Sequence, residues 1–292
     1  MDILFENLHN DKKPLAEKMR PKNLDEFVGQ KHILGQGKLL RRLIDAKRVP
    51  SVIFYGPPGT GKTTLARIIA DTSNSKFVKL NAISSGVADV KAVIEQAKSD
   101  FELYGQKTYL LLDECHRWSK AQSDSLLAAL ENGYLIFIGC TTENPSYSMT
   151  RAIVSRCSIF EFKRLGLDDV KDVLKRTMNS ETGLKAYNIK IDDDALSYIA
   201  AACGGDVRSA LNGLELGAIS TPKNNDGEII ITKEIAAECL QKKATSLSED
   251  VYYDLLSAFC KSLRGSDSTA ALYYANRLIE GGIEPQVLAR RT

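Results

Sequence analysis

Apolar and polar positions alternate in two different ways along the first 165 residues. Short apolar runs bounded by Gly, Pro or polar residues are typical of buried strands, and they alternate with segments whose apolar residues recur every three or four positions, as in amphipathic helices. This order predicts a parallel, doubly wound α/β sheet of five strands. We expect strands near 51–55, 76–80, 108–112, 134–140 and 158–162, and helices over 38–46, 62–70, 87–99 and 121–130.

After about Leu165 the strand pattern stops and helical spacing continues alone. It predicts helices over 168–178, 193–203, 207–214 and from about 232, then over 249–263 and 267–280. We therefore expect an all-α lid domain followed by the start of a helical C-terminal domain. Because the chain stops at Arg290-Arg291-Thr292 without a cap or a polar tail, we expect that last domain to be incomplete. The expected divisions are a flexible tail (1–13), the α/β domain (14–165), the lid (166–243) and the C-terminal domain (244–292).

A phosphate-binding motif sits between the first strand and its helix. The sequence Gly56-Pro57-Pro58-Gly59-Thr60-Gly61-Lys62-Thr63 matches G-x-x-x-x-G-K-[ST] at every fixed position. Glycines allow backbone N–H groups to turn toward phosphates, Lys62 supplies a positive charge, and the Thr63 hydroxyl is a ligand suited to Mg²⁺. We predict a nucleoside triphosphate site, with ATP and Mg²⁺ as ligands, formed by Gly56, Pro57, Pro58, Gly59, Thr60, Gly61, Lys62, Thr63 and Thr64.

Two acids follow the apolar run at 109–112, at the edge where parallel sheets bind ligands. We expect Asp113 to hold Mg²⁺ and Glu114 to orient or deprotonate the attacking water. The next strand ends in Thr141-Thr142-Glu143-Asn144, and Asn144 is a candidate to hydrogen-bond that water; alternatively it is a turn residue before Pro145. His116 invites a metal-ligand interpretation, but no second histidine stands at ligand spacing, so a polar contact behind the site is favoured.

Composition and charge limit the kinds of partner and site that we expect. Lys plus Arg number 39 against 37 for Asp plus Glu, so nucleic-acid binding would depend on local patches. The six cysteines form no C-x-x-C pair, which favours core positions over disulfides or zinc ligands. No apolar run reaches the ~18 residues of a membrane span, and no signal peptide is recognisable. We expect a cytoplasmic protein with no membrane partner.

With these motifs in place, the sequence resembles the clamp-loader-like branch of the AAA+ ATPases. Met19-Arg20-Pro21 with Asp25 to Gln30 resembles the branch's adenine-side motif, which implies that Arg20, Pro21 and Val28 contact the nucleotide. Leu80-Asn81-Ala82 resembles a motif whose polar residue restrains the catalytic glutamate. Ser155-Arg156-Cys157 matches the S-R-C motif, in which the arginine reaches a neighbouring subunit's γ-phosphate. Gly205 to Asn212 resembles sensor 2, which implies that Arg208 touches its own subunit's nucleotide.

Within that branch, the stretches PLAEKMRP, FIGCTTENPSY and KSLRGSDSTAALYYANRLIEGG resemble the RarA (MgsA) family, related to the Werner-helicase-interacting proteins. The resemblance covers residue 14 to the end. It implies a DNA-dependent ATPase of replication-fork maintenance and recombination or repair that acts at single-strand/duplex junctions or gaps. It also implies a nucleoid-associated location, a tetramer when the chain is full length, and replication partners such as single-stranded DNA-binding protein.

Alternatives remain open. Arg156 also has a physical rationale as a trans-acting arginine, but Arg151 competes for that role. A clamp-loader-like, ATP-switched binding module is the main alternative function. A protein unfoldase is less favoured because residues 82–87 contain no aromatic residue, and a DExH helicase is set aside because no second helicase core follows. The candidates for DNA contact are Lys91, Lys98, Arg117, Lys120, Arg290 and Arg291, each of which also fits a solvated face.

Overall fold

The computed structural model describes residues 13–73, 75–240 and 249–291. The predicted flexible tail lies outside the described residues except for Lys13, and so does the predicted boundary between residues 243 and 244. The chain forms two compact units, one ending at Leu240 and one beginning at Gln241. Each unit is described by itself.

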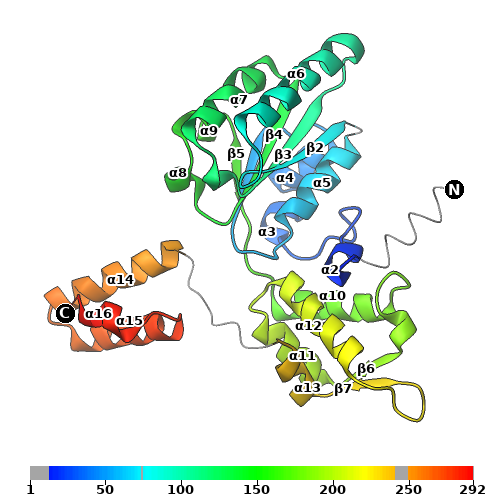
Figure 1. Ribbon diagram of the computed structural model, residues 1–292, viewed down its shortest axis with the longest axis vertical. Helices are drawn as coiled ribbons and strands as arrows, with labels where there is room; N and C mark the ends of the chain where they lie inside the picture. The colour runs from blue at the N-terminus through cyan, green and yellow to red at the C-terminus, as the bar shows by residue number, and fades with distance from the viewer. Residues whose placement is uncertain (1–12, 74, 241–248, 292) are drawn as a thin grey trace. The chain divides into compact units, whose positions relative to one another are not determined.

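The first unit is built around a five-stranded parallel sheet with the strand order β2-β3-β4-β1-β5 (Figure 1). The five-stranded parallel sheet expected from the sequence is confirmed. The inner strand β1 pairs with β4 on one side and with the edge strand β5 on the other. The strands are β1 (Val52–Tyr55), β2 (Lys76–Asn81), β3 (Thr108–Asp113), β4 (Leu135–Thr141) and β5 (Ser158–Glu161).

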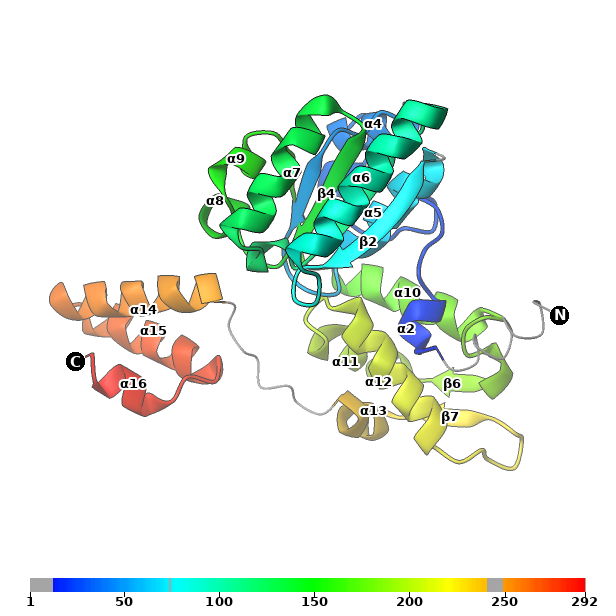
Figure 2. The same ribbon diagram turned by 45° about the horizontal axis from the view of Figure 1, so that its top comes forward.

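Helices cover both faces of this sheet, so successive strand residues enter two different cores (Figure 2). Phe54 and Leu111 face a core shared with α4 and α5, whereas Ile53 and Leu112 face a core shared with α6 and α7. Burial on both faces explains why these strands read as continuous apolar runs. The helices of this layer are α3 (Lys31–Leu34), α4 (Leu39–Asp45), α5 (Lys62–Thr72), α6 (Val87–Tyr104), α7 (Lys120–Asn132), α8 (Pro145–Ser148) and α9 (Arg151–Val154), with a 3₁₀ turn η1 (Cys115–Arg117).

A second, mostly helical core follows in the same unit. Asp206, predicted as an N-cap, accepts a hydrogen bond from the Ser209 backbone N–H at 3.1 Å and begins α12. The elements are α10 (Leu167–Asn179), a 3₁₀ turn η2 (Lys185–Tyr187), β6 (Ile189–Ile191), α11 (Asp193–Ala202), α12 (Val207–Ser220), β7 (Ile229–Ile231) and α13 (Lys233–Leu240).

The expectation of only helices after Leu165 is wrong in one respect. β6 and β7 form a two-stranded parallel sheet in which Ile189, Lys190 and Ile191 pair with Ile229, Ile230 and Ile231. Each strand has three residues, too few for alternation to stand out from the helical pattern around it. The pairing joins segments about forty residues apart, which no local signal records.

The N-terminal helix α2 (Leu15–Lys18) packs on the helical core and not on the sheet (Figure 2). Leu15 is 2% exposed among residues of α10, α11 and α12. Its backbone N–H donates to both carboxylate oxygens of Glu215 in α12 at 3.2 Å. The chain between α2 and α3 therefore runs from the helical core to the sheet.

The second unit contains α14 (Glu249–Arg264), α15 (Ser268–Glu280) and α16 (Pro285–Ala289). The first two agree with the helices expected at 249–263 and 267–280. Leu256, Phe259, Ala271, Leu278 and Leu288 form its core. None of the helices over the described ranges of the chain is long and apolar enough to cross a membrane.

Replacing Phe54 with Ala should strongly destabilise the α/β layer. Phe54 is 0% exposed on the inner strand β1, with its ring centroid 5.2 Å from that of Phe162. Truncating a buried Phe costs about 3–5 kcal/mol. Urea unfolding followed through the single tryptophan, Trp118, which packs in the same layer, measures the loss. Phe101→Ala on α6, where the side chain is 37% exposed, is the control and should cost under about 1 kcal/mol; equal losses would contradict this packing account.

Candidate nucleotide-binding site

The strand order places the phosphate-binding motif at the carboxyl end of β1, an inner strand of the sheet. β1 leads into Gly56, and β4 lies between β1 and β3, so the ends of three strands adjoin. The register pairs Tyr55 with Thr141, and Asp113 with Cys140. The connection from β1 crosses to β2 at the far edge of the sheet, which makes this a topological switch point, the usual ligand crevice of open α/β sheets.

Three glycines of the loop occupy positions at which a Cβ atom would not fit. Gly56, Gly59 and Gly61 have φ values of 137°, 68° and 96°, a region that L side chains rarely adopt. A Cβ on Gly56 would lie 2.1 Å from the Phe162 carbonyl oxygen, and one on Gly61 would lie 2.6 Å from the Phe27 ring. The motif's glycines are therefore required both by backbone conformation and by close approach.

Lys62 lies at the first position of α5, over its own loop. Its Nζ donates to the carbonyl oxygens of Gly56 and Pro57, both at 2.7 Å. Burial lowers the pKa of Lys62, and the negative charges of Glu114 and Asp113 act in the opposite direction. The ammonium group is thus tied to the loop and faces the acidic end of β3.

The predicted metal ligands are brought together. The Thr63 hydroxyl lies 3.4 Å from the Asp113 carboxylate, and Lys79 Nζ lies 3.6 Å from the same carboxylate oxygen. Glu114, the next residue, lines the cavity with them. Its φ of 54° is left-handed, a strained conformation for a non-glycine residue that is found preferentially at functional sites.

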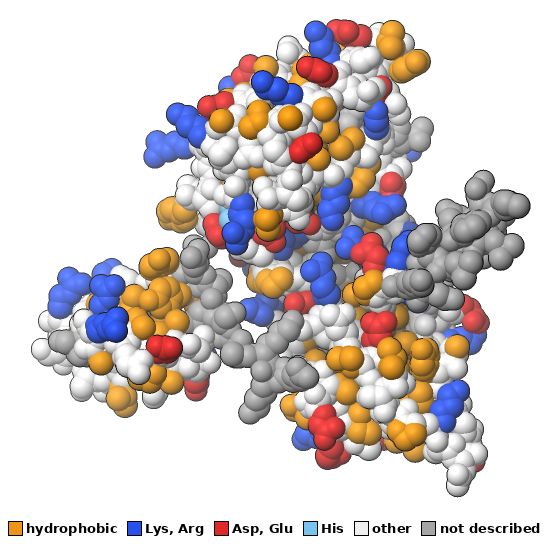
Figure 3. Space-filling view, viewed as in Figure 1, with side chains coloured by type: hydrophobic (Ala, Val, Ile, Leu, Met, Phe, Trp, Pro, Cys, Tyr) orange, Lys and Arg blue, Asp and Glu red, His pale blue; other side chains and the backbone are white. Residues whose placement is uncertain are grey.

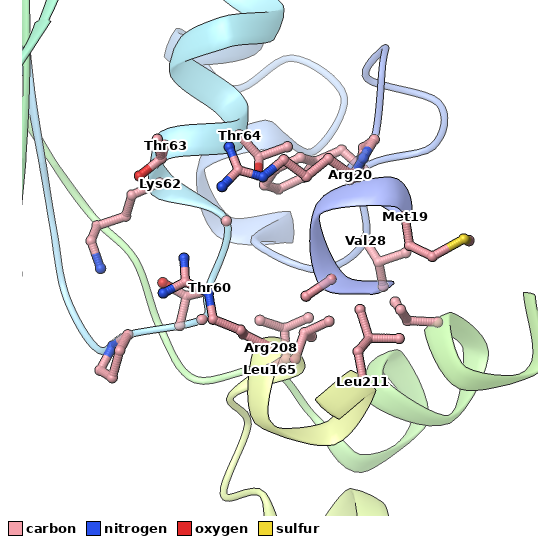
Figure 4. A pocket seen from close by; sticks show the side chains of 18 of the residues that line it. Met19, Arg20, Val28, Thr60, Lys62, Thr63, Thr64, Leu165, Arg208 and Leu211 are labelled. Carbon is pink, nitrogen blue, oxygen red and sulfur yellow. The ribbon is translucent and has the colours of Figure 1, made fainter. Parts of the chain in front are cut away.

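The other side of the cavity is apolar and comes from two distant parts of the chain. Figure 4 shows Met19, Val28, Leu165 and Leu211 on one side of the loop, opposite Lys62 and Thr63. An apolar wall next to a phosphate loop suits a flat heterocyclic base. The residues predicted on the adenine side, Arg20, Pro21 and Val28, all line this cavity.

The helical core closes the cavity at the N-terminus of α12. The Val207 backbone N–H donates to the Gly59 carbonyl oxygen at 3.3 Å, so α12 contacts the phosphate-binding loop directly. Arg208, the next residue, lines the cavity as predicted (Figure 4). Pro58 to Thr64 also line it, whereas Gly56 and Pro57 approach it through the carbonyls that hold Lys62.

Two predicted catalytic residues are not brought to this cavity. Asn144 caps α8, where its Oδ1 accepts from the Ser146 N–H at 3.0 Å, and it is not among the cavity-lining residues. Arg156 lies elsewhere on the α/β layer: its guanidinium bonds Glu131 Oε1 from Nε at 3.0 Å and the Ala152 carbonyl from Nη1 at 2.8 Å. Their catalytic roles stay predictions.

The structure adds residues that sequence reasoning did not single out. Thr142 lines the cavity where Asn144 was expected. Gln30 is 6% exposed and bridges the loop to β5, donating to Thr60 O at 3.4 Å and Lys163 O at 2.7 Å and accepting from the Lys163 N–H at 2.9 Å. Arg176 of α10 lines the cavity and donates to the Glu26 carbonyl at 2.7 Å. Gln30 stood inside a recognised motif; nothing local marks Arg176.

The cysteines near the site are core thiols. Cys115 and Cys140 are buried, and burial raises both pKa values well above the ordinary range. Burial raises the pKa of Cys157 to about 12. All six cysteines are free and, within the described residues, no group of three or more His, Cys, Asp or Glu side chains could hold a metal ion. The expectation of small core residues holds for Cys115 and Cys140.

Family models agree with this architecture. Residues 52–165 match the ATPase family associated with various cellular activities (AAA), and residues 185–264 match the AAA C-terminal domain. Together with the phosphate-binding loop, these matches show that the chain belongs to the AAA ATPases and carries an ATP-hydrolysing module.

The chain is similar to replication-associated recombination protein A of Bacillus subtilis, with 48% identity over 96% of this chain and 66% of that protein. It is 40% identical to the Escherichia coli K12 protein of the same name over 97% of this chain and 64% of that protein. ATPase WRNIP1 of Dictyostelium discoideum is 38% identical over 95% of this chain and 34% of that protein. The chain thus spans from a third to about two thirds of the length of these relatives.

Among solved structures, the Thermotoga maritima RuvB Holliday junction branch migration motor aligns with a TM-score of 0.59 at 24% identity. The alignment covers 85% of this chain and 81% of that chain. This likeness shows the fold. It agrees with the five-stranded sheet followed by a helical core.

Gly59→Ala should weaken nucleotide binding. The new Cβ would lie 1.7 Å from Asp206 Oδ1 and 2.9 Å from its Cα, so the N-terminus of α12 would move away from the loop. We expect at least about a tenfold loss of affinity for a fluorescent ATP analogue, equivalent to ~1.4 kcal/mol.

Gly105→Ala is the matched control. Gly105 has a similar φ of 64° but nothing within 4 Å of its ideal Cβ. Both variants carry the backbone strain of a positive φ, about 1–2 kcal/mol, and only Gly59→Ala adds the collision. Equal nucleotide affinities in the two variants would contradict the proposed contact between loop and α12.

Proposed function

We propose that this chain is the ATP-hydrolysing part of a DNA-dependent ATPase that acts in replication-associated recombination, at single-strand/duplex junctions or gaps. One observation carries the proposal: the phosphate-binding loop, Asp113, Glu114 and Arg208 line one cavity in a chain 48% identical over 96% of its length to a replication-associated recombination protein. The cavity supports ATP chemistry, and the similarity supports the DNA context.

We propose one role in ATP hydrolysis for each group of the cavity. Backbone N–H groups of residues 59–63 and the Lys62 ammonium bind the phosphates, with the N-terminus of α5 directed at them. Water attacks the γ-phosphorus, the bond to the bridging oxygen breaks to release ADP, and Glu114 accepts the proton of the attacking water. Thr142 lines the same cavity as Glu114, which supports the proposal that it orients that water, the role predicted for Asn144.

The residues present fit Mg²⁺. The Thr63 hydroxyl and the Asp113 carboxylate are hard oxygen ligands 3.4 Å apart, and Mg²⁺ is usually held by one or two carboxylates plus substrate phosphates and water. The ion would neutralise charge on the phosphate oxygens. Thr63 and Asp113 would hold it, and Lys79 would balance the charge of Asp113 from its outer side.

The DNA-binding surface is proposed from exposed basic residues near the carboxyl edge of the sheet. Arg117 and Lys120 lie shortly after Glu114 in the sequence, and Lys91 lies on α6. All three are exposed. Lys98 is also exposed and pairs with Glu102 at 3.7 Å. Basic and acidic side chains are interspersed over the face seen in Figure 3, so phosphate contacts would be local and few.

Assembly and setting belong to the same proposal. Arg156 is 38% exposed and away from its own cavity, as an arginine that serves a neighbouring subunit must be. We propose a homo-oligomer, a tetramer in the full-length protein, that works in the cytoplasm at the nucleoid with single-stranded DNA-binding protein. The domain division at residue 165 stays part of this proposal.

A clamp-loader-like, ATP-switched binding module is the second candidate, favoured by the same exposed Arg156 in the sequence Ser155-Arg156-Cys157. In that case hydrolysis resets a bound state and does not continue at steady state on DNA. A protein unfoldase remains the least favoured alternative. Ile83, 68% exposed in the turn after β2, is the apolar side chain at the position where unfoldases present an aromatic one.

DNA should stimulate steady-state ATP hydrolysis, most strongly with gapped or junction-containing DNA. Single-stranded, blunt duplex and gapped DNA of equal length are compared by phosphate release. Lys62→Ala should abolish binding and rate, whereas Glu114→Gln should bind ATP but lose about 10²- to 10⁴-fold in rate, as expected on removal of a general base. A rate that is unchanged by every DNA, with ATP hydrolysis intact, would contradict the DNA-dependent assignment.

Arg156→Ala should lose hydrolysis while keeping nucleotide affinity. Removing a trans-acting arginine costs about 10³- to 10⁵-fold in rate, and Arg156 does not line its own cavity. Mixing this variant with Lys62→Ala should recover activity, because the Lys62 variant supplies Arg156 to its neighbour's intact cavity. Arg151→Ala is the control. If Arg156→Ala kept full activity without the second variant, Arg156 would not be the trans-acting arginine. If activity were lost only in Arg151→Ala, the role would belong to Arg151.

A further inference from the structure

The imidazole of His116 lies between two carboxylates at the end of β3. Its Nδ1 is 3.5 Å from Glu114 Oε2, and its Nε2 is 3.3 Å from Glu143 Oε1. The His116 side chain is only 8% exposed. Two acids converge on one nearly buried ring, and one of them is the proposed base.

The ring is held in place from the neighbouring strand. Nδ1 also lies 2.9 Å from the hydroxyl of Thr141, the last residue of β4, which is 1% exposed. That hydroxyl accepts from the Glu143 backbone N–H at 3.0 Å. The contact with Thr141 is of hydrogen-bond length, whereas the contact with Glu114 is longer and electrostatic in character. Thr141 and Glu143 therefore fix the ring, and the fixed ring lies next to the Glu114 carboxylate.

The backbone brings the two residues together. Glu114 has a φ of 54° and begins the 3₁₀ turn η1, in which the Arg117 N–H donates to the Glu114 carbonyl at 3.0 Å. The turn redirects the chain immediately after β3, so that His116, two residues on, lies beside the Glu114 side chain. The strained conformation is thus coupled to the contact between ring and carboxylate.

The residue that the family resemblance implies for this task is engaged elsewhere. Asn81 pairs with Asp113 in the strand register, but its Oδ1 accepts from the Ile83 N–H at 2.9 Å in the turn after β2. Among the contacts of the described residues, the His116 ring is a partner of the Glu114 carboxylate, and Asn81 is not.

We propose that His116 is the positioning residue of the ATPase site, holding the Glu114 carboxylate through an electrostatic contact that Thr141 and Glu143 orient. The inference rests on the proposed role of Glu114 as base. His116 is not a cavity-lining residue, so it acts through Glu114 and not on the nucleotide. Nucleotide affinity should therefore be insensitive to His116, and the rate of hydrolysis should depend on it.

The test compares His116→Phe, which keeps a ring without a donor, with His116→Asn, whose amide nitrogen reproduces the Nδ1 position. We expect His116→Phe to lower kcat about 10- to 100-fold, the usual cost of removing a group that orients an active-site ligand. The KM for ATP and the affinity for a fluorescent ATP analogue should change less than about twofold. His116→Asn should recover most of the rate. His32→Phe, where His32 contacts the exposed Glu161 carbonyl, is the control and should leave kcat unchanged.

A double-mutant cycle separates positioning from a loss of fold. If His116 acts through Glu114, then His116→Phe should add nothing to the defect of Glu114→Gln, because the carboxylate to be held is already gone. The inference would be overturned if the rate losses of His116→Phe and Glu114→Gln multiplied in the double variant. It would also be overturned if His116→Phe raised the KM while lowering kcat, or left kcat unchanged. Full activity of Glu114→Gln would instead overturn the assignment of the base, so the two failures are distinguishable.

Discussion

The close approach of the loop at Gly59 to the N-terminus of α12 is the constraint on which the site depends. The Val207 N–H bonds the Gly59 carbonyl, and Asp206, which caps α12, fills the space where a Cβ would stand. This contact joins the α/β layer to the helical core, so that Arg208 and the apolar residues of α12 face the same cavity as Lys62. A nucleotide held there contacts both parts at once.

The acidic end of the site is formed by residues at the ends of two neighbouring strands. β3 delivers Asp113 to Thr63 and Glu114 to the cavity, while β4 delivers Thr141 to the ring of His116 and Thr142 to the cavity wall. Asp113 and Glu114 both line the cavity, whereas after β4 Thr142 lines it and Thr141 lies behind it, against His116. Lys62, whose pKa is lowered by burial, lies opposite these acids.

Most of the fold could be predicted from local sequence, because the sheet is buried on both faces and its strands are therefore continuous apolar runs. It also located the loop, the two acids and Arg208, since each lies in a short contiguous motif. The misses share a physical cause: they depend on pairing between distant segments. β6 and β7 are too short to show a period, and Arg176 reaches the cavity only because α10 packs beside the segment that contains Glu26. Asn144 stays a prediction, and Thr142 was not singled out because spacing alone does not show which residue after β4 lines the cavity.

A crystal structure of the chain with a non-hydrolysable ATP analogue and Mg²⁺ would test the central claim most directly. The account predicts phosphates on the N–H groups of residues 59–63, the metal ion between Thr63 and Asp113, and the base against Met19, Val28, Leu165 and Leu211. Arg208 would contact the same nucleotide. A nucleotide bound by the loop alone, with its base outside this apolar wall and α12 away from Gly59, would contradict it.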